Sequence, residues 1–428
     1  MRIELPRKSE RFGATMFYAP VQVYELDSGV VEHPESEHDA IVALTHDRIY
    51  DIQRDMAVVI PVRGERIRLI EGILFAIPSQ CLVIVVSNSP REPVDRFQVE
   101  RLSIGRFARL ARKRVILIHQ KDPLLGRAFI ESGYPELVGE DGLVRDGKSE
   151  GMIMAMVLAR LAGKSYVGFV DADNYSPGAA YEYVREYAAG FALASSPYSM
   201  VRILWQSKPK IVDGQLFFAR WGRVSRLTND FLNALVSHYT GFGTDILATG
   251  NAGEHALSME LALKLDYGTG YSVEPQHIVS LLEIFGGELE CPYPDVMRQG
   301  VDVLQIESRG PHFHQSGPDD HIQEMARLAL GSIHGSPLCP PSIRHDIEQA
   351  LVHHQVIEPG AAVEAPRRYP HLDRVDFDRF RRLVAEEIYL HGQGRERLPR
   401  SWSAPAKPRS GRRTRDDELP ETNKHGPD

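Results

Sequence analysis

The sequence predicts an α/β fold in which a largely parallel sheet carries helices on both faces. Short, apolar, β-rich runs alternate with helical stretches between residues 56 and 170, a pattern typical of parallel strands buried on both faces. Each run ends in polar, loop-forming residues, at the edge where open α/β sheets bind ligands. The sequence lacks GxGxxG, so it does not carry the ordinary dinucleotide fingerprint. The expected strands are Met56–Ile60, Cys81–Val86, Val115–Ile118 and Tyr166–Val170.

Two carboxylates follow the last of these strands. Asp171 and Asp173 are separated by one residue, and the turn-forming residues Asn174, Ser176 and Pro177 come next. Paired acids at a strand end suit a hard divalent cation that also holds phosphate oxygens. The alternative is an ordinary acidic turn, because an Asp-x-Asp alone is a weak signal.

Composition narrows the class of protein. The chain has 428 residues, 43% of them hydrophobic, and a formal net charge of −8, which gives no general reason to expect nucleic acid as a partner. Cys81, Cys291 and Cys339 lie far apart, so we predict neither a zinc site nor a disulfide framework. The N-terminal residues lack an apolar signal core, and no apolar run approaches the roughly 20 residues of a membrane span. We therefore expect a cytoplasmic protein that does not bind membranes.

The chain divides into four expected parts. A β-rich N-terminal addition to the sheet, with strands at Thr15–Tyr18 and Val21–Tyr24, precedes the core, and amphipathic helices follow it. The last part is rich in Arg, Pro, Ser and Lys and then acidic, which is typical of disorder. The boundaries are 1–55 for the addition, 56–319 for the core (divided into 56–174 and 175–319), 320–391 for the helical region and 392–428 for a disordered tail.

Periodicity and turn signals place the remaining elements. We expect a β-hairpin of Val201–Trp205 and Ile211–Phe218, with Lys208, Pro209 and Asp213-Gly214 in its turn region. A strand is expected at Val301–Ile306. The expected helices are Arg66–Phe75, Met152–Leu161, Ala179–Tyr187, Leu227–His238, Ala256–Leu265, 320–334, 344–355 and Asp373–His391.

Several charged residues near expected helix starts could bind phosphate. Lys148 precedes a helix and could reach a diphosphate as a point charge, or it could be a solvated helix-entry lysine. Arg223 and Ser225 lie at the start of another helix, where free N–H groups favour anions and Arg adds bidentate recognition. That entry could equally be basic with nothing bound. Arg63 and Glu65 could contact a ribose or base, or could be surface charges.

Two loops add further candidates. His312 and His314 follow the expected strand Val301–Ile306 and could supply a neutral imidazole to the same cation, although a histidine is more often structural or solvated. Gly250 and Gly253 would let the backbone approach a ligand closely.

Together these pieces resemble a known family. The motifs are Ile60-Pro-Val-Arg-Gly-Glu65, Gly147-Lys-Ser-Glu150, Asp171-Ala-Asp-Asn174, Gly250-Asn-Ala-Gly-Glu254 and Ser308-Arg-Gly-Pro-His312. This combination resembles the mannosyl-3-phosphoglycerate synthases from about Met56 to His321. The related glucosyl-3-phosphoglycerate synthases share much of the layout.

The resemblance implies a GT-A glycosyltransferase fold and the transfer of mannose from GDP-mannose to 3-phosphoglycerate with retention of the α configuration. The product would be mannosyl-3-phosphoglycerate, the precursor of the compatible solute mannosylglycerate. A divalent metal is implied, with Mg²⁺ expected first and Mn²⁺, Co²⁺ or Zn²⁺ as alternatives. The C-terminal helices would suit a homodimer.

The resemblance also assigns roles to residues. Asp171 and Glu254 are the candidate catalytic carboxylates, and Asp173 with His312 or His314 would hold the metal. The nucleotide-binding candidates are Pro61, Val62, Arg63, Glu65, Ser87, Asn88, Gln120, Lys148, Asp171 and Ala172. The acceptor-binding candidates are Arg223, Val224, Ser225, Asn251, Ala252 and Gly253.

Other functions remain open at this stage. A glucosyl-3-phosphoglycerate synthase would differ in its donor, and a sugar-nucleotide sensor would keep the fold without turnover. A nucleotidyltransferase is less favoured, because its first loop is usually glycine-rich and basic, whereas Pro61–Glu65 is so only in part. The mechanism could be a same-face displacement or a covalent two-step route, which would need a carboxylate under the sugar.

Overall fold

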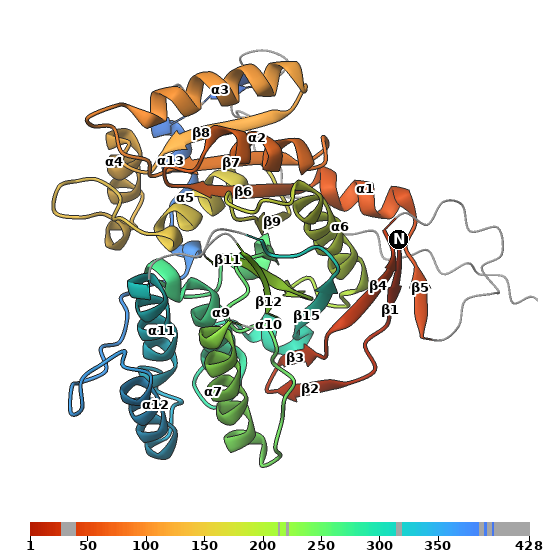
Figure 1. Cartoon of the computed structure of the whole chain (residues 1–428), viewed down its shortest axis with the longest axis vertical. Helices are drawn as coiled ribbons and strands as arrows, with labels where there is room; N and C mark the ends of the chain where they lie inside the picture. The colour runs from red at the N-terminus through yellow and green to blue at the C-terminus, as the bar shows by residue number, and fades with distance from the viewer. Residues whose placement is uncertain are drawn as a thin grey trace, which may run out of the picture.

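The computed structural model describes residues 1–26, 40–212, 215–219, 222–313, 319–384, 389–391 and 396–397. One large mixed sheet runs through these residues, and helices cover both of its faces (Figure 1). The α/β class predicted from the sequence is therefore confirmed. The strand order is β18-β17-β8-β7-β6-β9-β13-β10-β15-β4-β1-β5, with β3 beside β15 and β2 beside β3.

The strands of this sheet come from almost the whole length of the chain. They are β1 (Arg2–Glu4), β2 (Ser9–Phe12), β3 (Thr15–Tyr18), β4 (Val21–Glu25), β5 (Ile41–Ala43), β6 (Met56–Val62), β7 (Leu82–Ser87), β8 (Arg114–His119), β9 (Tyr166–Phe169), β10 (Ser199–Trp205), β13 (His255–Ser258), β15 (Val301–Ser308), β17 (Tyr389–His391) and β18 (Glu396–Arg397). Two small sheets stand apart: β11 (Lys208–Val212) with β12 (Gln215–Ala219), and β14 (Tyr267–Gly268) with β16 (Arg368–Tyr369).

The four strands predicted between residues 56 and 170 form the parallel half of the sheet. Strand β6 pairs in parallel with β7 and β9, and β7 pairs in parallel with β8. The register sets Val62 beside Ser87 and Ser87 beside His119, so these strands end in one row. The loops that follow them therefore open onto the same edge of the sheet.

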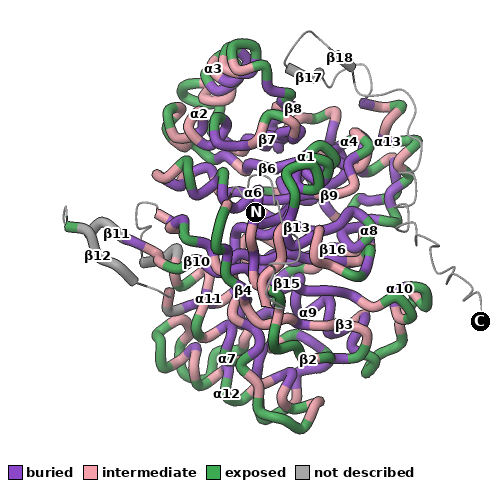
Figure 2. Tube along the Cα trace, turned by 90° about the vertical axis from the view of Figure 1, so that its right-hand side faces the viewer, coloured by how far each residue is buried: buried purple, intermediate pink, exposed green. Residues whose placement is uncertain are grey.

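Alternating side chains of these strands enter two separate cores. Along β6, Val58 and Ile60 pack on one face, and Ala57 and Val59 pack on the other. Both sets are buried, because successive strand residues point to opposite faces and helices cover each face. Figure 2 shows this burial along the central strands.

The helices divide between the two faces. Those that contribute to the core of Val58 are α1 (His46–Arg54), α2 (Ile67–Ala76), α3 (Arg96–Leu110) and α6 (Pro177–Leu193). Those that contribute to the core of Ala57 are α4 (Pro123–Glu131), α5 (Lys148–Leu161), α7 (Arg223–Thr240), α8 (Met259–Ala262), α9 (Val273–Phe285), α10 (Pro294–Gln299), α11 (Asp319–His334), α12 (Pro341–His353) and α13 (Phe377–Val384). Figure 1 shows α7, α11 and α12 packed together at one end of the molecule.

The helix expected at Ala256–Leu265 is wrong. The segment begins as strand β13, which pairs antiparallel with both β9 and β10, and only the short helix α8 follows. All four residues of β13 are buried. The apolar run suits a helix by local propensity, but the gap between two neighbouring strands decides its conformation, as tertiary context commonly does.

The expected hairpin is also wrong in its pairing. Strand β10 lies in the main sheet between β13 and β15, whereas β12 pairs with β11. Lys208 and Pro209 therefore belong to strand β11, and Asp213-Gly214 lies outside the described residues. Turn-forming residues near Pro209 gave a misleading signal, because proline is tolerated in an edge strand.

The chain ends differ from expectation as well. The helix predicted for Asp373–His391 is described only as α13, and Tyr389–His391 forms strand β17 against the edge strand β8. Helix α1 was not expected in the β-rich N-terminal part. Of the tail predicted as disordered, Glu396–Arg397 pairs with β17, and the rest lies outside the described residues. No helix in the described part combines the length and apolar character needed to cross a membrane.

Candidate active site

The loops after β6, β7, β8 and β9 meet at a cavity of about 260 Å³. Segments from the second half of the chain close its other side, including the loop before β13, the start of α9 and the loop after β15. Most residues predicted for the site line this cavity: Pro61, Val62, Arg63, Glu65, Asn88, Gln120, Lys148, Asp171, Ala172, Asp173, Asn251, Gly253 and His312.

Lys148 lies between two carboxylates at the wall of the cavity. Its Nζ is 2.8 Å from Oδ1 of Asp171 and 3.0 Å from Oε1 of Glu274. Burial alone would lower the pKa of this ammonium group, but the two carboxylates outweigh burial and raise the pKa well above its ordinary value. Lys148 is therefore a fixed positive charge at every physiological pH.

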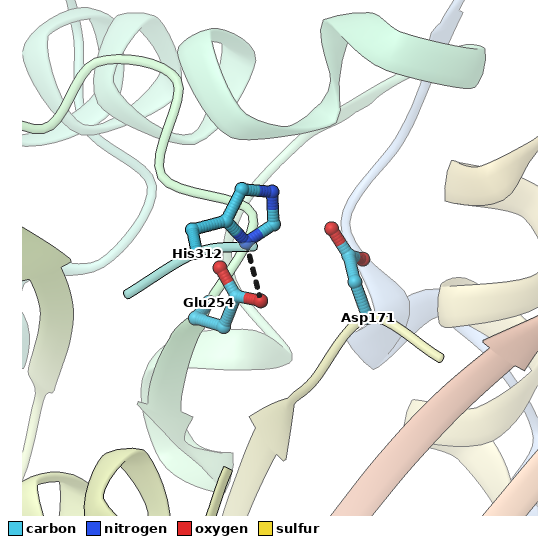
Figure 3. A group of neighbouring side chains, drawn as sticks. All are labelled: Asp171, Glu254 and His312. Atoms are coloured by element: carbon cyan, nitrogen blue, oxygen red, sulfur yellow. Dashed lines mark ion pairs between the residues drawn. The ribbon is translucent and has the colours of Figure 1, made fainter. Parts of the chain in front are cut away.

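Asp171, Glu254 and His312 form the second cluster. Each offers one ligand atom, and these atoms lie within 4.8 Å of one another. Oε1 of Glu254 is 3.2 Å from Nδ1 of His312, and the carboxylate of Asp171 lies beside the same imidazole (Figure 3). Glu254 is fully buried. Within the described part of the chain, neither of its carboxylate oxygens accepts a hydrogen bond.

This donor set fits a divalent cation. Two carboxylates and one imidazole are ligands that such cations accept in proteins. A buried carboxylate that receives no hydrogen bond is costly unless a positive charge offsets it. Asp173 lines the same cavity but is not part of the three-residue cluster, and His314 lies outside the described residues.

A glycine allows the two clusters to come close to the backbone. A Cβ atom at Gly253 would lie 2.9 Å from Oδ2 of Asp171 and 3.3 Å from Nζ of Lys148. Any other residue would therefore displace these side chains. This is a physical reason for a glycine in the loop before Glu254.

The nucleotide-binding candidates do not all reach the cavity. Ser87 is fully buried, and its Oγ donates to Oε2 of Glu100 over 2.6 Å, so it braces the strand end. Gln120 lines the cavity and donates from Nε2 to the carbonyls of Arg145 and Gly147, which fixes the loop before α5. Burial raises the pKa of Glu65, and the nearby charge of Asp173 adds to this effect.

The acceptor-binding candidates gather at the start of α7. Ser225 lies with Asn251 and Ala252 around a second, much smaller cavity of about 10 Å³, which shares Trp205 and Lys208 with the large one. Val224 is buried. Arg223 is the first residue of α7, and its side chain lies outside the described part of the structure.

Several site residues were not predicted from the sequence. Glu274 pairs with Lys148, and Trp205 stacks on His312 with ring centroids 4.6 Å apart. Nζ of Lys208 lies 3.8 Å above the Trp205 ring, a cation–π contact. The buried Arg202 donates to the carbonyls of Thr249 and Gly250, and so supports the loop that carries Asn251. Among these residues, Glu274 ends the glycine-rich stretch Gly268–Glu274, and this stretch was the signal in the sequence that could have identified it as a site residue.

The class of protein follows from this arrangement. Sugar transfer from a nucleotide diphosphate requires groups that stabilise the leaving diphosphate beside a buried space for the sugar. The sheet edge, the lysine and the candidate cation cluster supply both, and the chain is a glycosyltransferase.

Comparisons with known proteins agree. The sequence model described as mannosyl-3-phosphoglycerate synthase (osmo_MPGsynth) matches residues 5–384. The curated mannosyl-3-phosphoglycerate synthase of Pyrococcus furiosus is 41% identical over 385 residues, covering 90% of this chain and 97% of that protein. That of Aeropyrum pernix is 35% identical over 351 residues, covering 82% and 89%. The chain belongs to the mannosyl-3-phosphoglycerate synthase family.

Among solved structures, the glucosyl-3-phosphoglycerate synthase of Mycobacterium tuberculosis in complex with UDP is similar with a TM-score of 0.47 and 17% identity. The match covers 78% of this chain and 96% of that one.

Proposed function

We propose that this protein transfers mannose from GDP-mannose to 3-phospho-D-glycerate with retention of the α configuration, giving mannosyl-3-phosphoglycerate for the synthesis of a compatible solute. The C1–O bond to the β-phosphate breaks, and a new bond forms to the one free hydroxyl of the acceptor, on C2. The observation that carries the proposal is that Lys148, Asp171 and His312 line one cavity in a chain of this family, with the buried Glu254 next to His312.

The proposed cation ligands are His312 and the acid pair Asp171 and Asp173, which all line the cavity, with Glu254 beside His312. A divalent cation bound there would take up part of the negative charge of the leaving diphosphate. Glu254 lies next to Nδ1 of His312, so it can hold the ring with a proton on Nδ1 and leave Nε2 available as a ligand. We expect Mg²⁺ as the physiological ion, with Mn²⁺, Co²⁺ and Zn²⁺ as substitutes.

Lys148 is proposed to stabilise the leaving diphosphate from the other side. Its ammonium group is already held at the wall by Asp171 and Glu274, so it needs little reorganisation when the leaving group gains charge. The loops after β6 and β7, at Arg63 and Asn88, are proposed to hold the nucleoside.

The acceptor is proposed to bind between the start of α7 and the loop at residues 251–253. Free N–H groups of the first helical turn and the guanidinium of Arg223 would hold its phosphate. Asn251 lines both cavities, so it lies where the acceptor would meet the sugar.

Same-face displacement is the mechanism that this site favours over a covalent two-step route. Asp171 is held by Lys148, and Glu254 is buried next to His312 and does not line the cavity, so neither candidate carboxylate is placed as a free nucleophile under the sugar. In a same-face displacement the leaving phosphate itself assists deprotonation of the acceptor hydroxyl, and no protein nucleophile is required.

The first test is release of nucleotide diphosphate by the purified protein with Mg²⁺. GDP-mannose, GDP-glucose and UDP-glucose would each be supplied with 3-phosphoglycerate or with D-glycerate. We expect release with GDP-mannose and 3-phosphoglycerate only. A preference for a glucose donor would reassign the protein to the glucosyl-transferring relatives, and no release with any pair would favour a non-catalytic sugar-nucleotide sensor.

Two further expectations go with this proposal. We expect a homodimer, because the helices beyond residue 320 offer a surface for one, and a cytoplasmic location. Size-exclusion chromatography with light scattering tests the first, and cell fractionation tests the second.

A further inference from the structure

The two loops proposed to hold the cation come from strands that are not neighbours. Asp171 and Asp173 follow β9, and His312 follows β15, while β13 and β10 lie between these strands. Three strand spacings amount to roughly 14 Å at the level of the sheet. Backbone pairing in the sheet therefore cannot by itself bring the two loops together over the cavity.

A buried asparagine next to the acid pair spans this gap. Asn174 is 1% exposed and directly follows Asp173. Its Oδ1 accepts a hydrogen bond from the backbone N–H of Ser176 over 2.9 Å, which closes a local turn. Its Nδ2 donates to the carbonyl of Pro311 over 3.1 Å, one residue before His312. One side chain thus joins the two loops.

Helix α6 follows the same turn and makes two more hydrogen bonds to residues 309–311, the segment before His312. The hydroxyl of Tyr183, a fully buried residue, donates to the carbonyl of Gly310 over 3.2 Å. Oε1 of Glu182 accepts from the backbone N–H of Arg309 over 2.7 Å. Three consecutive residues of the 309–311 segment are therefore fixed by one continuous segment, residues 174–183.

A contact on the far side of His312 completes the connection. The backbone N–H of Tyr175 donates to the carbonyl of Phe313 over 2.7 Å, and the rings of these residues meet edge to face with centroids 5.2 Å apart. His312 is thus bracketed on both sides by groups attached to the turn after Asp173.

We propose that Asn174 and Tyr183 are positioning residues that set the separation of the Asp171–Asp173 loop from His312. This inference rests on the proposed function, because it takes His312 and the acid pair as the cation ligands. Neither residue lines the cavity, so their effect on a cation passes through the loops they hold. Removal of groups that orient ligands typically weakens metal binding by about 10- to 100-fold.

The test measures binding of Mn²⁺ to the full-length protein by calorimetry, with and without GDP. The variants are Tyr183→Phe, which removes one hydroxyl, Asn174→Ala, which removes the contacts of Asn174 with Ser176 and Pro311, and Asn174→Ser. Both Tyr183→Phe and Asn174→Ala also remove the 3.5 Å contact between Nδ2 of Asn174 and the Tyr183 hydroxyl. A serine hydroxyl can still accept from the N–H of Ser176 but is too short to reach the carbonyl of Pro311. We expect all three to weaken Mn²⁺ binding by at least about tenfold, with Asn174→Ser close to Asn174→Ala.

Tyr239→Phe is the matched control. This change also removes a tyrosine hydroxyl that donates to a carbonyl, that of Leu338 over 2.7 Å, at the opposite end of α7 from the proposed acceptor site. The melting temperature in EDTA should fall no further in Tyr183→Phe than in Tyr239→Phe. Excess Mn²⁺ should restore kcat in the positioning variants while the KM for 3-phosphoglycerate stays near that of the wild type.

The outcomes distinguish a failure of the positioning role from a failure of the proposed cation site. If the wild type binds Mn²⁺ and the three variants bind it within about twofold, the positioning role is wrong and the cation site stands. A normal affinity in Asn174→Ser alone would show that Asn174 acts only through its local turn, and the positioning role of its contact with Pro311 would be wrong. If the wild type binds no Mn²⁺ even with GDP, the proposed cation site fails, and the positioning role falls with it.

Discussion

Lys148 shows how burial and charge compete at a single side chain. Burial disfavours its ammonium form, yet Asp171 and Glu274 hold that form so strongly that its pKa rises. The same arrangement makes the carboxylates dependent on the lysine, because Glu274 is also almost buried. A charge removed from this group leaves the others uncompensated in a poorly solvated site.

We expect Lys148→Met to lower the free energy of unfolding by about 2–4 kcal/mol, because two carboxylates then lose their counter-charge. Lys148→Met combined with Glu274→Gln should regain part of this loss, since one uncompensated charge is removed. Urea unfolding of both variants measures the effect. The control is Glu274→Gln in the wild type. If Glu274→Gln lowered the free energy of unfolding by the same amount in the wild type and in Lys148→Met, the two residues would not be coupled.

Arg223→Ala tests the proposed acceptor phosphate site. Loss of a charge-assisted hydrogen bond of about 1.5–3 kcal/mol should raise the KM for 3-phosphoglycerate by about 10- to 100-fold, with a small change for GDP-mannose. Arg226→Ala, exposed three residues further along α7, is the control and should leave both constants nearly unchanged. Equal increases for donor and acceptor would contradict the assignment.

At the level of residues, local signals predicted part of the wall of the cavity. Asp171, Lys148 and His312 were identifiable because each stands at a strand or helix end, where chain polarity alone predicts a functional edge. Glu274 was missed because its partner lies 126 residues away in the sequence, and Arg202 because it is a charged residue within a buried strand. Such contacts depend on how distant segments pack, which short-range patterns do not encode.

Helices and strands whose conformation depends on local sequence were predicted better than those whose conformation depends on tertiary packing. The parallel strands β6, β7, β8 and β9 are continuous apolar runs, and their ends matched expectation closely. Strand β13 was missed, because only its position between β9 and β10 makes that segment extended. For the same reason β17 was mistaken for the end of a helix, although it pairs with the edge strand β8.

Helix α9 carries a buried histidine that makes stability depend on pH. His277 is fully buried against His255 and Tyr267, and burial lowers its pKa to about 3, with Arg202 adding to the effect. In the unfolded chain this histidine has an ordinary pKa of about 6.5, so between about pH 6.5 and pH 3 it binds a proton while His277 of the native protein stays neutral. The contribution of His277 to the free energy of unfolding is therefore complete above about pH 6.5 and is lost as the pH drops toward 3.

His277→Gln should reduce this acid sensitivity. Between pH 7 and pH 5 the wild type should lose about 2 kcal/mol more of its free energy of unfolding than the variant, because glutamine does not titrate. Chemical denaturation at the two pH values measures the difference, with His354→Gln at an exposed position as the control. Parallel losses in the wild type and in His277→Gln would contradict the assignment of this histidine.

At the scale of the whole molecule, the segment near residue 369 supports the active site from a distance. Strand β16 pairs with β14. The hydroxyl of Tyr369 donates to Oε1 of Glu150 over 2.7 Å, and Glu150 lies two residues after Lys148 in the sequence. The family match ends at residue 384, beyond this contact. The region predicted to follow the core after residue 319 therefore contacts the helix that begins at Lys148.

Deletion of residues 398–428 should leave kcat and KM within about twofold of the wild type. This segment lies beyond the family match and beyond strand β18, and its composition predicts a polar, disordered tail. Steady-state kinetics and the melting temperature of the shortened protein check this. A fall in melting temperature of several degrees would mean that the tail packs on the body.

The position of β15 has a consequence for how the protein is made. Strands β3 and β4 both pair with β15, and the hydroxyl of Tyr18 reaches Asp302, 284 residues later. The ribosome releases these N-terminal strands long before their partner has been synthesised. A nascent chain shorter than about 310 residues would therefore expose unpaired strand edges, which are templates for aggregation. This end of the sheet can close only late in translation, so we expect pauses before that point to be more harmful than pauses after it.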